Sequence, residues 1–285
     1  MRTLPEVIIE PLVRAALLED LGRAGDITTD SIIPADARAE VQLVAREPGV
    51  VAGTACAVLA WRLVDPAITA TIHLRDGSRV EPGSVIGTIE GPARGLLTAE
   101  RVALNFLGHL SGVATGTATI ADAIAHTHAR VCDTRKTIPG MRALQKHAVR
   151  AGGGANHRFG LDDAVLVKDN HIAVAGGISN AVRAVRANAG HMVKVEVEVD
   201  DLAQLRELLE LGVDAVLLDN MGPDLLRQAV DLVDGRMITE ASGRITPETA
   251  VPIAEAGVDL ISVGWLTHSA RVLDIGLDHG VTFQA

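Results

Sequence analysis

The chain has 285 residues, 48% of them hydrophobic and 2% aromatic, and it carries a formal net charge of −10 at pH 7. A chain of this length and apolar content buries a substantial core, which fits one large domain or a small domain joined to a barrel-sized one. The acidic balance and the absence of Tyr argue against a nonspecific nucleic-acid binder, because that function needs a broad basic face and aromatic side chains for base stacking.

The first 21 residues do not have the pattern of an export signal or a membrane span. They contain no unbroken hydrophobic stretch and no small-residue cleavage site, so we expect neither export nor membrane insertion. Cys56 and Cys132 lie far apart in apolar surroundings, which is typical of reduced, buried thiols in a reducing compartment. We therefore expect a cytoplasmic protein.

Residues 1–111 are predicted to form a separate α/β layer. Helical patterns at residues 5–21 and 55–63 flank strand-like runs that are separated by Pro-Gly and Asp-Gly turns. The strand-like runs cover residues 39–46, 68–74 and 85–90. A further helix is predicted from Thr98 and carries Arg101. We expect the C-terminal tail, residues 267–285, to pack back onto this N-terminal domain.

Residues 112–266 are predicted to form a second domain around a parallel sheet. From residue 130 onward, short apolar runs alternate with helical segments, several of which stop at a glycine. Such a sheet is either open and doubly wound or closed as a barrel. The predicted strands end at Arg135, Lys168, Glu198, Asp219, Ser242 and Gly264. Polar or glycine residues at these carboxyl ends favour an α/β barrel, and because the span is short for eight units we expect an incomplete barrel of six to seven strands.

A basic segment runs from residue 130 to residue 170, with eight Arg and Lys against four acids. We interpret it as an anion-binding site, and a dicarboxylate would account for this much positive charge. Guanidinium groups bind carboxylates bidentately, at roughly 1.5–3 kcal/mol per charged hydrogen bond. The candidate ligands are Arg135, His157, Arg158 and Lys168. An ordinary salt bridge for either arginine and a structural role for His157 remain open.

Three other basic residues in this segment have a different interpretation. Arg142, Lys146 and Arg150 are spaced by four, so we expect them to line a solvated helix face. The run Gly152-Gly153-Gly154 resembles a phosphate loop only in its glycine content, and we favour a flexible connection there.

Glu198 and Asp219 end neighbouring predicted strands and supply hard oxygen ligands. Mg²⁺ is usually held by one or two carboxylates together with substrate oxygens, so we predict a magnesium site here, with direct contacts or contacts through water. Glu196 faces the same way on the same strand, but only Glu198 stands at the strand end, which favours Glu198 as the ligand.

The last two loops of the barrel domain, residues 240–244 and 264–269, lie where α/β barrels commonly bind a phosphate on backbone N–H groups. Ser242 and Gly243 follow the penultimate strand, and Thr246 is suited to cap the helix behind them. We predict a phosphate site at these loops.

Taken in order, these motifs resemble the quinolinate phosphoribosyltransferase family over essentially the whole chain. The motifs are GDITT at 25–29, LTAER at 97–101, DTRKT at 133–137, GGGANHR at 152–158, KDNH at 168–171, VEVEV at 195–199, LDN at 218–220, EASG at 240–243 and SVG at 262–264. The resemblance implies an N-terminal α/β sandwich domain joined to an incomplete barrel. It also implies a homodimer that uses Mg²⁺ and transfers phosphoribosyl from phosphoribosyl pyrophosphate to quinolinate with loss of CO₂.

The resemblance also implies roles for individual residues. The quinolinate carboxylates would be bound by Arg135, His157, Arg158, Lys168 and the partner's Arg101. The phosphoribosyl donor would be bound by Thr134, Lys136, Glu198, Asp219, Ser242, Gly243, Gly264 and His268. Catalysis would fall to Lys136, Lys168, Glu198 and Asp219. Arg244 and Trp265 depart from the small residues expected at their positions.

Three other functions compete with this one. Lys168 at a strand end could form a Schiff base, as in a barrel aldolase. Glu198, Asp219 and Glu240 on consecutive strands are similar to the metal triad of enolase-like barrels. A non-catalytic relative would keep the fold without the reaction, although it should lack part of the dicarboxylate set, and here that set is complete.

Overall fold

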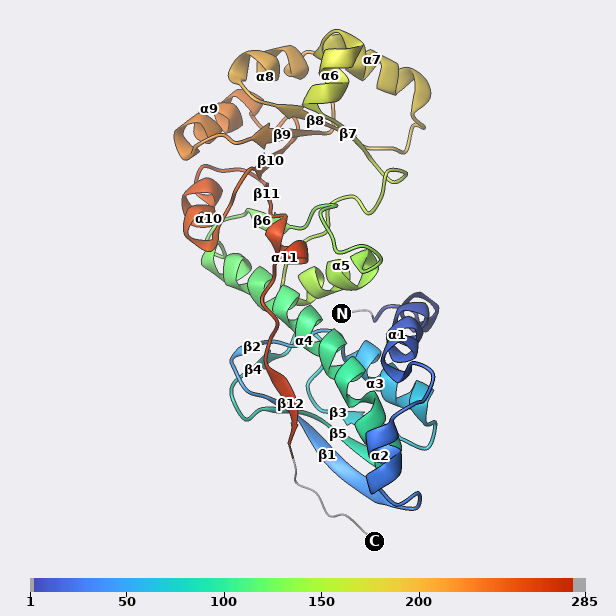
Figure 1. The fold of residues 1–285 in the computed structure, drawn as a ribbon. Coiled ribbons are helices and arrows are strands. Elements are labelled where there is room, and N and C mark those ends of the chain that lie inside the picture. The colour runs from blue at the N-terminus through green and yellow to red at the C-terminus, as the bar shows by residue number, and fades with distance from the viewer. Residues whose placement is uncertain (1–2, 279–285) are drawn as a thin grey trace. The chain divides into compact units, whose positions relative to one another are not determined.

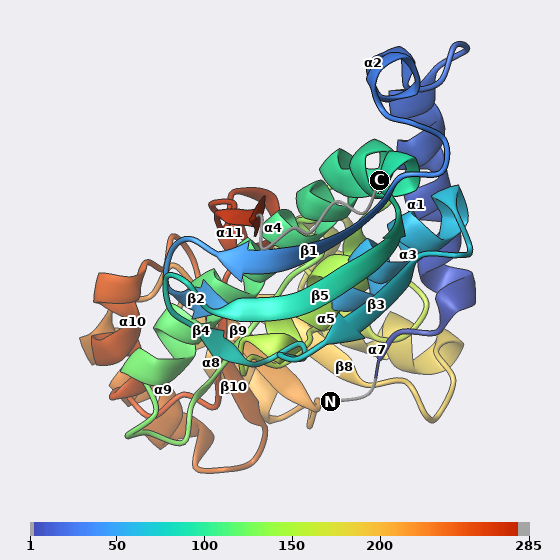
Figure 2. The same cartoon turned by 90° about the horizontal axis from the view of Figure 1, so that it is seen from below.

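The computed structural model describes residues 3–278, which form two compact units (Figures 1 and 2). Within this range the first unit comprises residues 3–118, 137–153 and 267–278, and the second comprises Thr119–Lys136 and Gly154–Leu266. The segment 137–153, predicted to belong with the barrel, therefore packs with the first unit. None of the helices in the described range is long and apolar enough to cross a membrane.

The first unit is built on an antiparallel sheet with the strand order β12-β1-β5-β3. The strands are β1 (Arg38–Ala45), β3 (Thr69–Ile72), β5 (Val85–Pro92) and β12 (Ile275–Asp278), with β2 (Gly49–Val50) and β4 (Arg79–Val80) as a separate pair. The helices are α1 (Glu6–Leu21), α2 (Ile27–Ile32), α3 (Thr54–Val64), α4 (Ala93–Ala123) and α5 (Arg142–Ala151). The core contains Trp61 of α3, which is fully buried and donates a hydrogen bond from Nε1 to the Leu96 carbonyl oxygen at 3.1 Å.

The C-terminal tail packs back onto the first unit, as far as the structure describes it. Strand β12 pairs antiparallel with β1, with Leu277 opposite Leu43 and Ile275 opposite Ala45. The rest of the predicted tail, residues 279–285, lies outside the described residues. Helix α4 begins at Ala93, five residues before the predicted start at Thr98, because β5 continues directly into it.

Two predictions for the basic segment are wrong. The side chain of Lys146 is buried, with 3% of its surface exposed, because its helix α5 packs into the core of the first unit through Leu144 and Val149. Gly152 is packed tightly rather than placed in a flexible connection. A Cβ added at this glycine would lie 2.2 Å from the Ala114 carbonyl oxygen of α4, so the close approach of α4 and α5 requires glycine there.

The second unit contains a six-stranded parallel sheet with the order β6-β11-β10-β9-β8-β7. Its strands are β6 (Arg130–Cys132), β7 (Val165–Val167), β8 (Val195–Val199), β9 (Ala215–Asp219), β10 (Ile238–Ser242) and β11 (Leu260–Ser262). Its helices are α6 (Asp169–Ala175), α7 (Ile178–Asn188), α8 (Leu202–Leu209), α9 (Pro223–Val233) and α10 (Pro247–Ala254). The short helix α11 (Trp265–His268) begins in the second unit and ends in the first. An isolated parallel bridge also joins Cys132 of β6 to Ala155.

The order of the strands confirms the predicted incomplete α/β barrel. Strands β6 and β7 occupy the two ends of the order, and no pairing joins them among the described residues. The side chains that pack on the helices are apolar and buried, as at Val197 of β8, Leu218 of β9 and Ile261 of β11. The opposite face of the sheet carries the polar side chains, which places the candidate site there.

Candidate active site

Strand register brings the predicted strand-end residues onto one face of the sheet. Glu198 of β8 pairs with Leu217 of β9, and Asp219, two residues farther along β9, pairs with Ser242 of β10. Residues paired across parallel strands point the same way, and so do residues two apart along one strand. Glu198, Asp219 and Ser242 therefore share one face at the carboxyl end of the sheet.

Lys168 and Glu198 form an ion pair across the ends of β7 and β8. Lys168 Nζ lies 2.9 Å from Glu198 Oε2, and the lysine side chain is 48% exposed. Asp219, on the next strand, accepts a hydrogen bond from the side-chain amide of Asn220. Two partly buried carboxylates on adjacent strand ends supply the hard oxygen donors that suit Mg²⁺.

Arg135 and Arg158 form the cationic part of the face. The pKa of Arg158 is lowered by burial and by the positive charge of Arg135, and the carboxylates of Asp163 and Glu196 oppose this shift. Arg158 Nη1 donates to the Ala164 carbonyl oxygen at 3.1 Å, which fixes the guanidinium. Two cations held near each other against their mutual repulsion are suited to a dianion.

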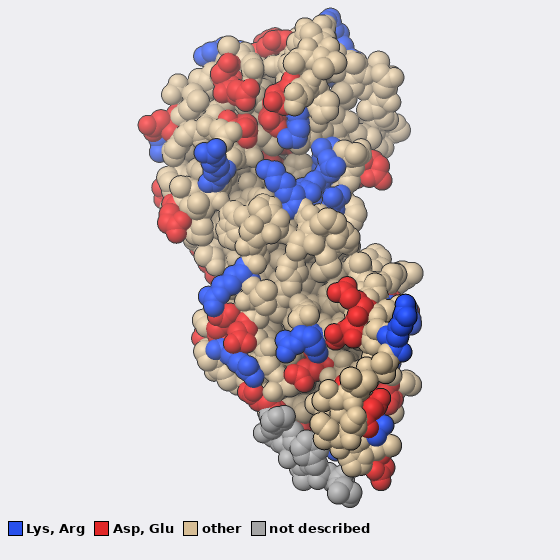
Figure 3. Space-filling model, in the orientation of Figure 1, with Lys and Arg blue, Asp and Glu red and all other residues tan. Residues whose placement is uncertain are grey.

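The DTRKT segment lies at the end of β6. Thr134 accepts a hydrogen bond on Oγ1 from the Lys136 N–H at 3.0 Å, which fixes the turn, and the side chain of Lys136 is exposed. On the molecular face drawn in Figure 3, a group of Lys and Arg side chains lies together on the surface of the second unit.

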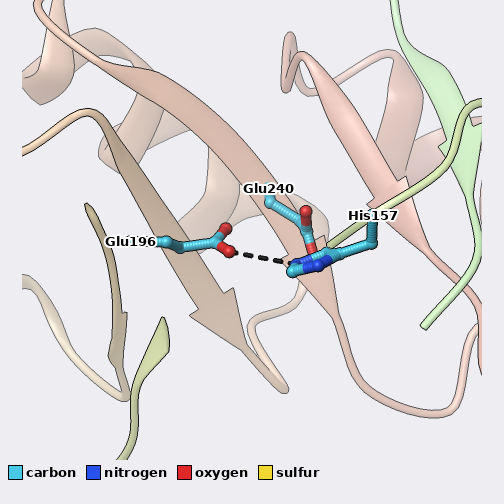
Figure 4. A group of neighbouring side chains, drawn as sticks. All are labelled: His157, Glu196 and Glu240. Atoms are coloured by element: carbon cyan, nitrogen blue, oxygen red, sulfur yellow. Dashed lines mark ion pairs between the residues drawn. The ribbon is translucent and has the colours of Figure 1, made fainter. Parts of the chain in front are cut away.

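His157 lies between two glutamates that the sequence analysis did not include in the site (Figure 4). Its Nε2 is 3.0 Å from Glu196 Oε2 and 3.6 Å from Glu240 Oε1. These three ligand atoms lie within 4.8 Å of one another, so the group is a second candidate for a metal site. Glu196 belongs to β8 and Glu240 to β10, and both point toward His157.

Glu240 is a deeply buried carboxyl group of this face, with 1% of its surface exposed. Burial and the nearby charge of Glu196 raise the pKa of Glu240 to about 7, while His157 and hydrogen bonds from Ser262 and Cys132 oppose the shift. Its Oε1 atom has no hydrogen-bond partner, although Nε2 of His157 lies near it. Glu240 therefore holds a proton more readily than an ordinary carboxyl group.

The two loops predicted to bind phosphate are held by close packing and by hydrogen bonds. Gly243 has φ of 110°, and a Cβ added there would lie 2.3 Å from Asn220 Oδ1, so the position requires glycine. Thr246 caps α10 by accepting a hydrogen bond from the Thr249 N–H. Trp265 Nε1 donates to the Ile245 carbonyl oxygen at 2.9 Å and so joins the loop after β11 to the loop after β10. This contact gives the unexpected tryptophan a structural role.

Two predicted site residues, Arg101 and His268, belong to the first unit. Arg101 is an exposed residue of α4 and lines a surface pocket with Asp20, Asp26 and Thr98 of the same unit. His268 ends α11, where Nδ1 lies 2.7 Å from Ser269 Oγ. The strand-end face of the second unit contains the other predicted site residues.

Comparison with known proteins decides the family. Two family models, described as the N-terminal and C-terminal domains of quinolinate phosphoribosyl transferase, match residues 26–111 and 113–278. The chain belongs to the quinolinate phosphoribosyltransferase family. This result confirms the resemblance and sets aside the aldolase-like and enolase-like alternatives. The Lys168 ammonium, held in an ion pair with Glu198, also does not fit the desolvated lysine of a Schiff-base enzyme.

Relatives in this quinolinate phosphoribosyltransferase family match nearly the whole chain. The nicotinate-nucleotide pyrophosphorylase [carboxylating] of Mycobacterium leprae is 46% identical over 271 residues, which cover 93% of this chain and 95% of the relative. The probable enzyme of that name from Bacillus subtilis is 43% identical over 270 residues, covering 95% and 93%. The crystal structure of NadC from Streptococcus pyogenes is 41% identical, covers 100% of both chains and superposes with a TM-score of 0.96.

Glu196 and Glu240 are the residues of the site that sequence reasoning missed. Glu196 was set aside because it does not stand at a strand end, and Glu240 was considered only for a metal triad. A charged residue among Ile238, Thr239 and Ala241 of β10 was an available signal, because a glutamate in an apolar strand needs a buried partner.

Proposed function

We infer that this enzyme transfers phosphoribosyl from phosphoribosyl pyrophosphate to quinolinate and releases pyrophosphate and CO₂, giving nicotinate mononucleotide. The observation that carries this inference is the family membership of both domains together with the paired cations Arg135 and Arg158 at the barrel's strand ends. The two quinolinate carboxylates match those two guanidinium groups in charge, and a guanidinium group can bind a carboxylate through two parallel hydrogen bonds.

The proposed acid site holds quinolinate by charged hydrogen bonds from Arg135, Arg158 and Lys168. Lys168 is already oriented by Glu198, and Arg158 is fixed by its hydrogen bond to the Ala164 carbonyl oxygen. Groups fixed before the substrate binds lose little conformational freedom on binding. His157, the remaining predicted ligand of this site, lies at 12% side-chain exposure beside Glu196.

The proposed donor site uses the carboxyl ends of strands β8 to β11. Glu198 and Asp219 would hold Mg²⁺, directly or through water, and the ribose beside it, because both are partly buried carboxylates on adjacent strands. Ser242, Gly243 and Gly264 would receive the 5′-phosphate on main-chain N–H groups, with α10 capped behind them. Thr134, Lys136 and His268 complete the predicted donor-binding set.

Fixed charge would supply most of the catalysis. Bound Mg²⁺ would stabilise the negative charge that develops on the pyrophosphate leaving group. The Lys136 ammonium, placed on the same set of loops, would add to that effect while the pyridine nitrogen attacks the anomeric carbon. No nucleophilic side chain is required. After transfer the ring is a pyridinium, whose positive charge would stabilise the electron pair left on the ring carbon when the adjacent carboxylate departs as CO₂. A proton from water would then add to that carbon and complete nicotinate mononucleotide.

We further propose that the enzyme is a homodimer whose subunits share their active sites. Arg101 is exposed on α4 and would complete the partner subunit's acid site. Two variants test this role, because Arg101→Ala and Lys136→Ala would each be inactive as homodimers. Mixed after unfolding and refolding, they should regain activity through hybrid dimers with one intact site. A mixture that stays inactive, although light scattering shows a dimer, would contradict the shared site. We further place the enzyme in the cytoplasm, because the buried residues Cys56 and Cys132 form no disulfide with each other.

A coupled assay tests the reaction itself. Purified protein is given quinolinate, phosphoribosyl pyrophosphate and Mg²⁺, and nicotinate mononucleotide and CO₂ are followed together, with nicotinate as the control acid. We expect both products from quinolinate, none from nicotinate, and loss of activity with a chelator that excess Mg²⁺ reverses. Turnover of nicotinate instead would overturn the dicarboxylate assignment. Activity that survives the chelator would contradict the magnesium proposal alone.

A further inference from the structure

Arg158 opens a short surface loop that ends where β7 begins. The loop covers residues 158–164 and carries the exposed apolar side chains of Phe159 and Leu161. An exposed loop has little apolar packing to fix its main chain, and so its order depends on hydrogen bonds. The direction of the Arg158 guanidinium, one of the two in the proposed acid site, therefore depends on the hydrogen bonds of this loop.

The chain is fixed on both sides of the loop. Before it, the main-chain N–H of His157 donates to Asp133 Oδ1 at 3.0 Å, and Asp133 is fully buried directly after β6. After it, the N–H of Val165, the first residue of β7, donates to the Lys194 carbonyl oxygen at 2.9 Å. The conformation that remains to be fixed is that of the loop between these two points.

Asp163 joins the two ends of this loop. Its Oδ2 accepts the Phe159 N–H at 2.6 Å, and its Oδ1 accepts the Gly160 N–H at 2.9 Å. The two carboxylate oxygens thus bind the two N–H groups that directly follow Arg158. Hydrogen bonds to an ionised carboxylate are roughly twice as strong as those between neutral groups. A single side chain at the end of the loop therefore holds its first turn.

The side chain of Arg158 crosses the same loop. Its Nη1 donates to the carbonyl oxygen of Ala164 at 3.1 Å, and Ala164 is the residue after Asp163. The main chain that carries the guanidinium and the carbonyl that orients it are therefore both adjacent to residues that Asp163 connects. Loss of the Asp163 carboxylate would free the two together.

The charge of Asp163 has a separate effect. Burial and the charge of Arg135 lower the pKa of Arg158, and Asp163 is one of two carboxylates that oppose this shift. A negative charge near the arginines also repels the carboxylates of an incoming dianion. Removal of the charge alone would therefore strengthen dianion binding, whereas removal of the hydrogen bonds would weaken it. The two effects of Asp163 differ in sign, so a measurement can separate them.

We propose that Asp163 is a positioning residue of the acid-binding site, whose carboxylate holds the loop 158–164 closed and so directs the Arg158 guanidinium before quinolinate binds. A side chain that is already directed loses little conformational freedom when its ligand arrives. This proposal rests on the proposed function, because it takes Arg158 to bind a quinolinate carboxylate.

Isothermal titration of full-length variants with quinolinate tests the sign. Asp163→Ala removes both acceptor oxygens and Asp163→Asn keeps one, while Asp162→Asn removes the same charge from the exposed neighbour on the loop. We expect affinity to fall about tenfold in Asp163→Ala and about threefold in Asp163→Asn, with Asp162→Asn at least as tight as the wild type. Phosphoribosyl pyrophosphate should bind all three equally well. Unchanged or tighter quinolinate binding by Asp163→Ala would overturn the proposal.

A double-mutant cycle tests whether Asp163 acts through Arg158. In the background of Arg158→Ala there is no guanidinium to direct, so Asp163→Ala should change quinolinate affinity by less than about twofold. Were the full loss to persist in that background, Asp163 would support the site in another way, and the positioning role would be refuted.

Amide hydrogen exchange, followed by nuclear magnetic resonance, tests the loop without any substrate. The N–H groups of Phe159 and Gly160 should exchange faster in Asp163→Ala than in the wild type or in Asp162→Asn. Equal exchange in all three proteins would contradict the proposed closure of the loop.

The titrations separate this proposal from the proposed function. If the wild-type protein binds quinolinate and Asp163→Ala binds it equally well, only the positioning proposal fails. If the wild-type protein does not bind quinolinate, the proposed function fails, and the assignment of Asp163 to an acid-binding site fails with it.

Discussion

Lys168 Nζ lies 2.9 Å from Glu198 Oε2, so one ion pair joins the proposed acid site to the proposed magnesium site. Lys168→Ala should raise the KM for quinolinate by about tenfold, because it removes a charged hydrogen bond. It should hardly change the melting temperature, because the lysine is 48% exposed and such pairs contribute little to stability. Lys194→Ala, which breaks the exposed pair with Asp214, is the matched control. An unchanged KM would remove Lys168 from the acid site.

The two paired arginines should act mainly on the acid. We expect Arg135→Ala or Arg158→Ala to weaken quinolinate binding by roughly 2–4 kcal/mol, with smaller effects on phosphoribosyl pyrophosphate. Isothermal titration with each ligand measures both effects. Arg227→Ala, on an exposed helix pair with Asp224, controls for loss of surface charge. Equal weakening of both ligands would mean that the arginine serves the whole site rather than the acid.

Gly243→Ala should damage the donor site selectively. The new Cβ would meet Asn220 Oδ1 at 2.3 Å, and the backbone has φ of 110°, so the loop after β10 must shift. We expect a KM for phosphoribosyl pyrophosphate raised by about tenfold or more, with quinolinate binding near that of the wild type. Gly190→Ala, where an added Cβ meets nothing within 4 Å, should behave as the wild type. Loss of quinolinate binding would assign this loop to the other substrate.

The carboxylate of Asp76 should stabilise the first unit more at neutral pH than at acidic pH. Burial would raise its pKa, but hydrogen bonds from His147, Thr54 and the Gly53 N–H outweigh burial and lower the pKa below the ordinary value of 3.8. A lowered folded pKa means that the stabilisation is complete above the unfolded value and is lost as the pH falls through the folded value. Asp76→Asn should therefore cost about 1–3 kcal/mol at pH 7, and less near pH 3. Melting temperatures across this range measure the difference, with Asp36→Asn as an exposed control.

Glu240 should have the opposite pH dependence. Burial raises its pKa from 4.5 to about 7, so the folded protein holds a proton that the unfolded chain releases, and stability falls as the pH rises between these two values. Glu240→Gln mimics the protonated group and should remove this loss. Its melting temperature relative to the wild type should rise from pH 5 to pH 8, whereas that of Glu210→Gln, an exposed control, should not. A constant difference would mean that Glu240 does not change its protonation state between pH 5 and pH 8.

The residues at the strand ends could be predicted from the sequence, because each one directly follows an apolar run that forms a strand. In a parallel sheet all carboxyl ends meet at one edge, so a polar residue after each apolar run was enough to bring Lys168, Glu198 and Asp219 together. The same logic predicts the barrel, and the short span of residues 112–266 predicts that the barrel is incomplete. This reasoning does not give the bounds of every helix. Helix α4 starts at Ala93, directly after the last residue of β5, and not at the predicted Thr98.

Features that depend on register and long-range packing could not be predicted. Glu196 and Glu240 approach His157 because β8, β9 and β10 pair in one particular register, and a single sequence does not specify that register. The buried Lys146 and the tight Gly152 depend on the packing of α5 against residues far away in sequence. For both residues, the sequence of the segment is compatible with an exposed position as well as with a buried one.

The antiparallel sheet of the first unit has a consequence for synthesis of the protein on the ribosome. Strand β12, from Ile275 to Asp278, is hydrogen-bonded to β1, whose residues are made some 230 positions earlier, as the pairing of Leu277 with Leu43 shows. Until the last part of the chain has been translated, β1 has an open edge that invites pairing with other chains. A nascent chain stopped at residue 111 also lacks α5 and the apolar side chains that this helix adds to the core. The unit that begins first in the sequence is therefore among the last to be completed, and one edge of β1 stays unpaired until then.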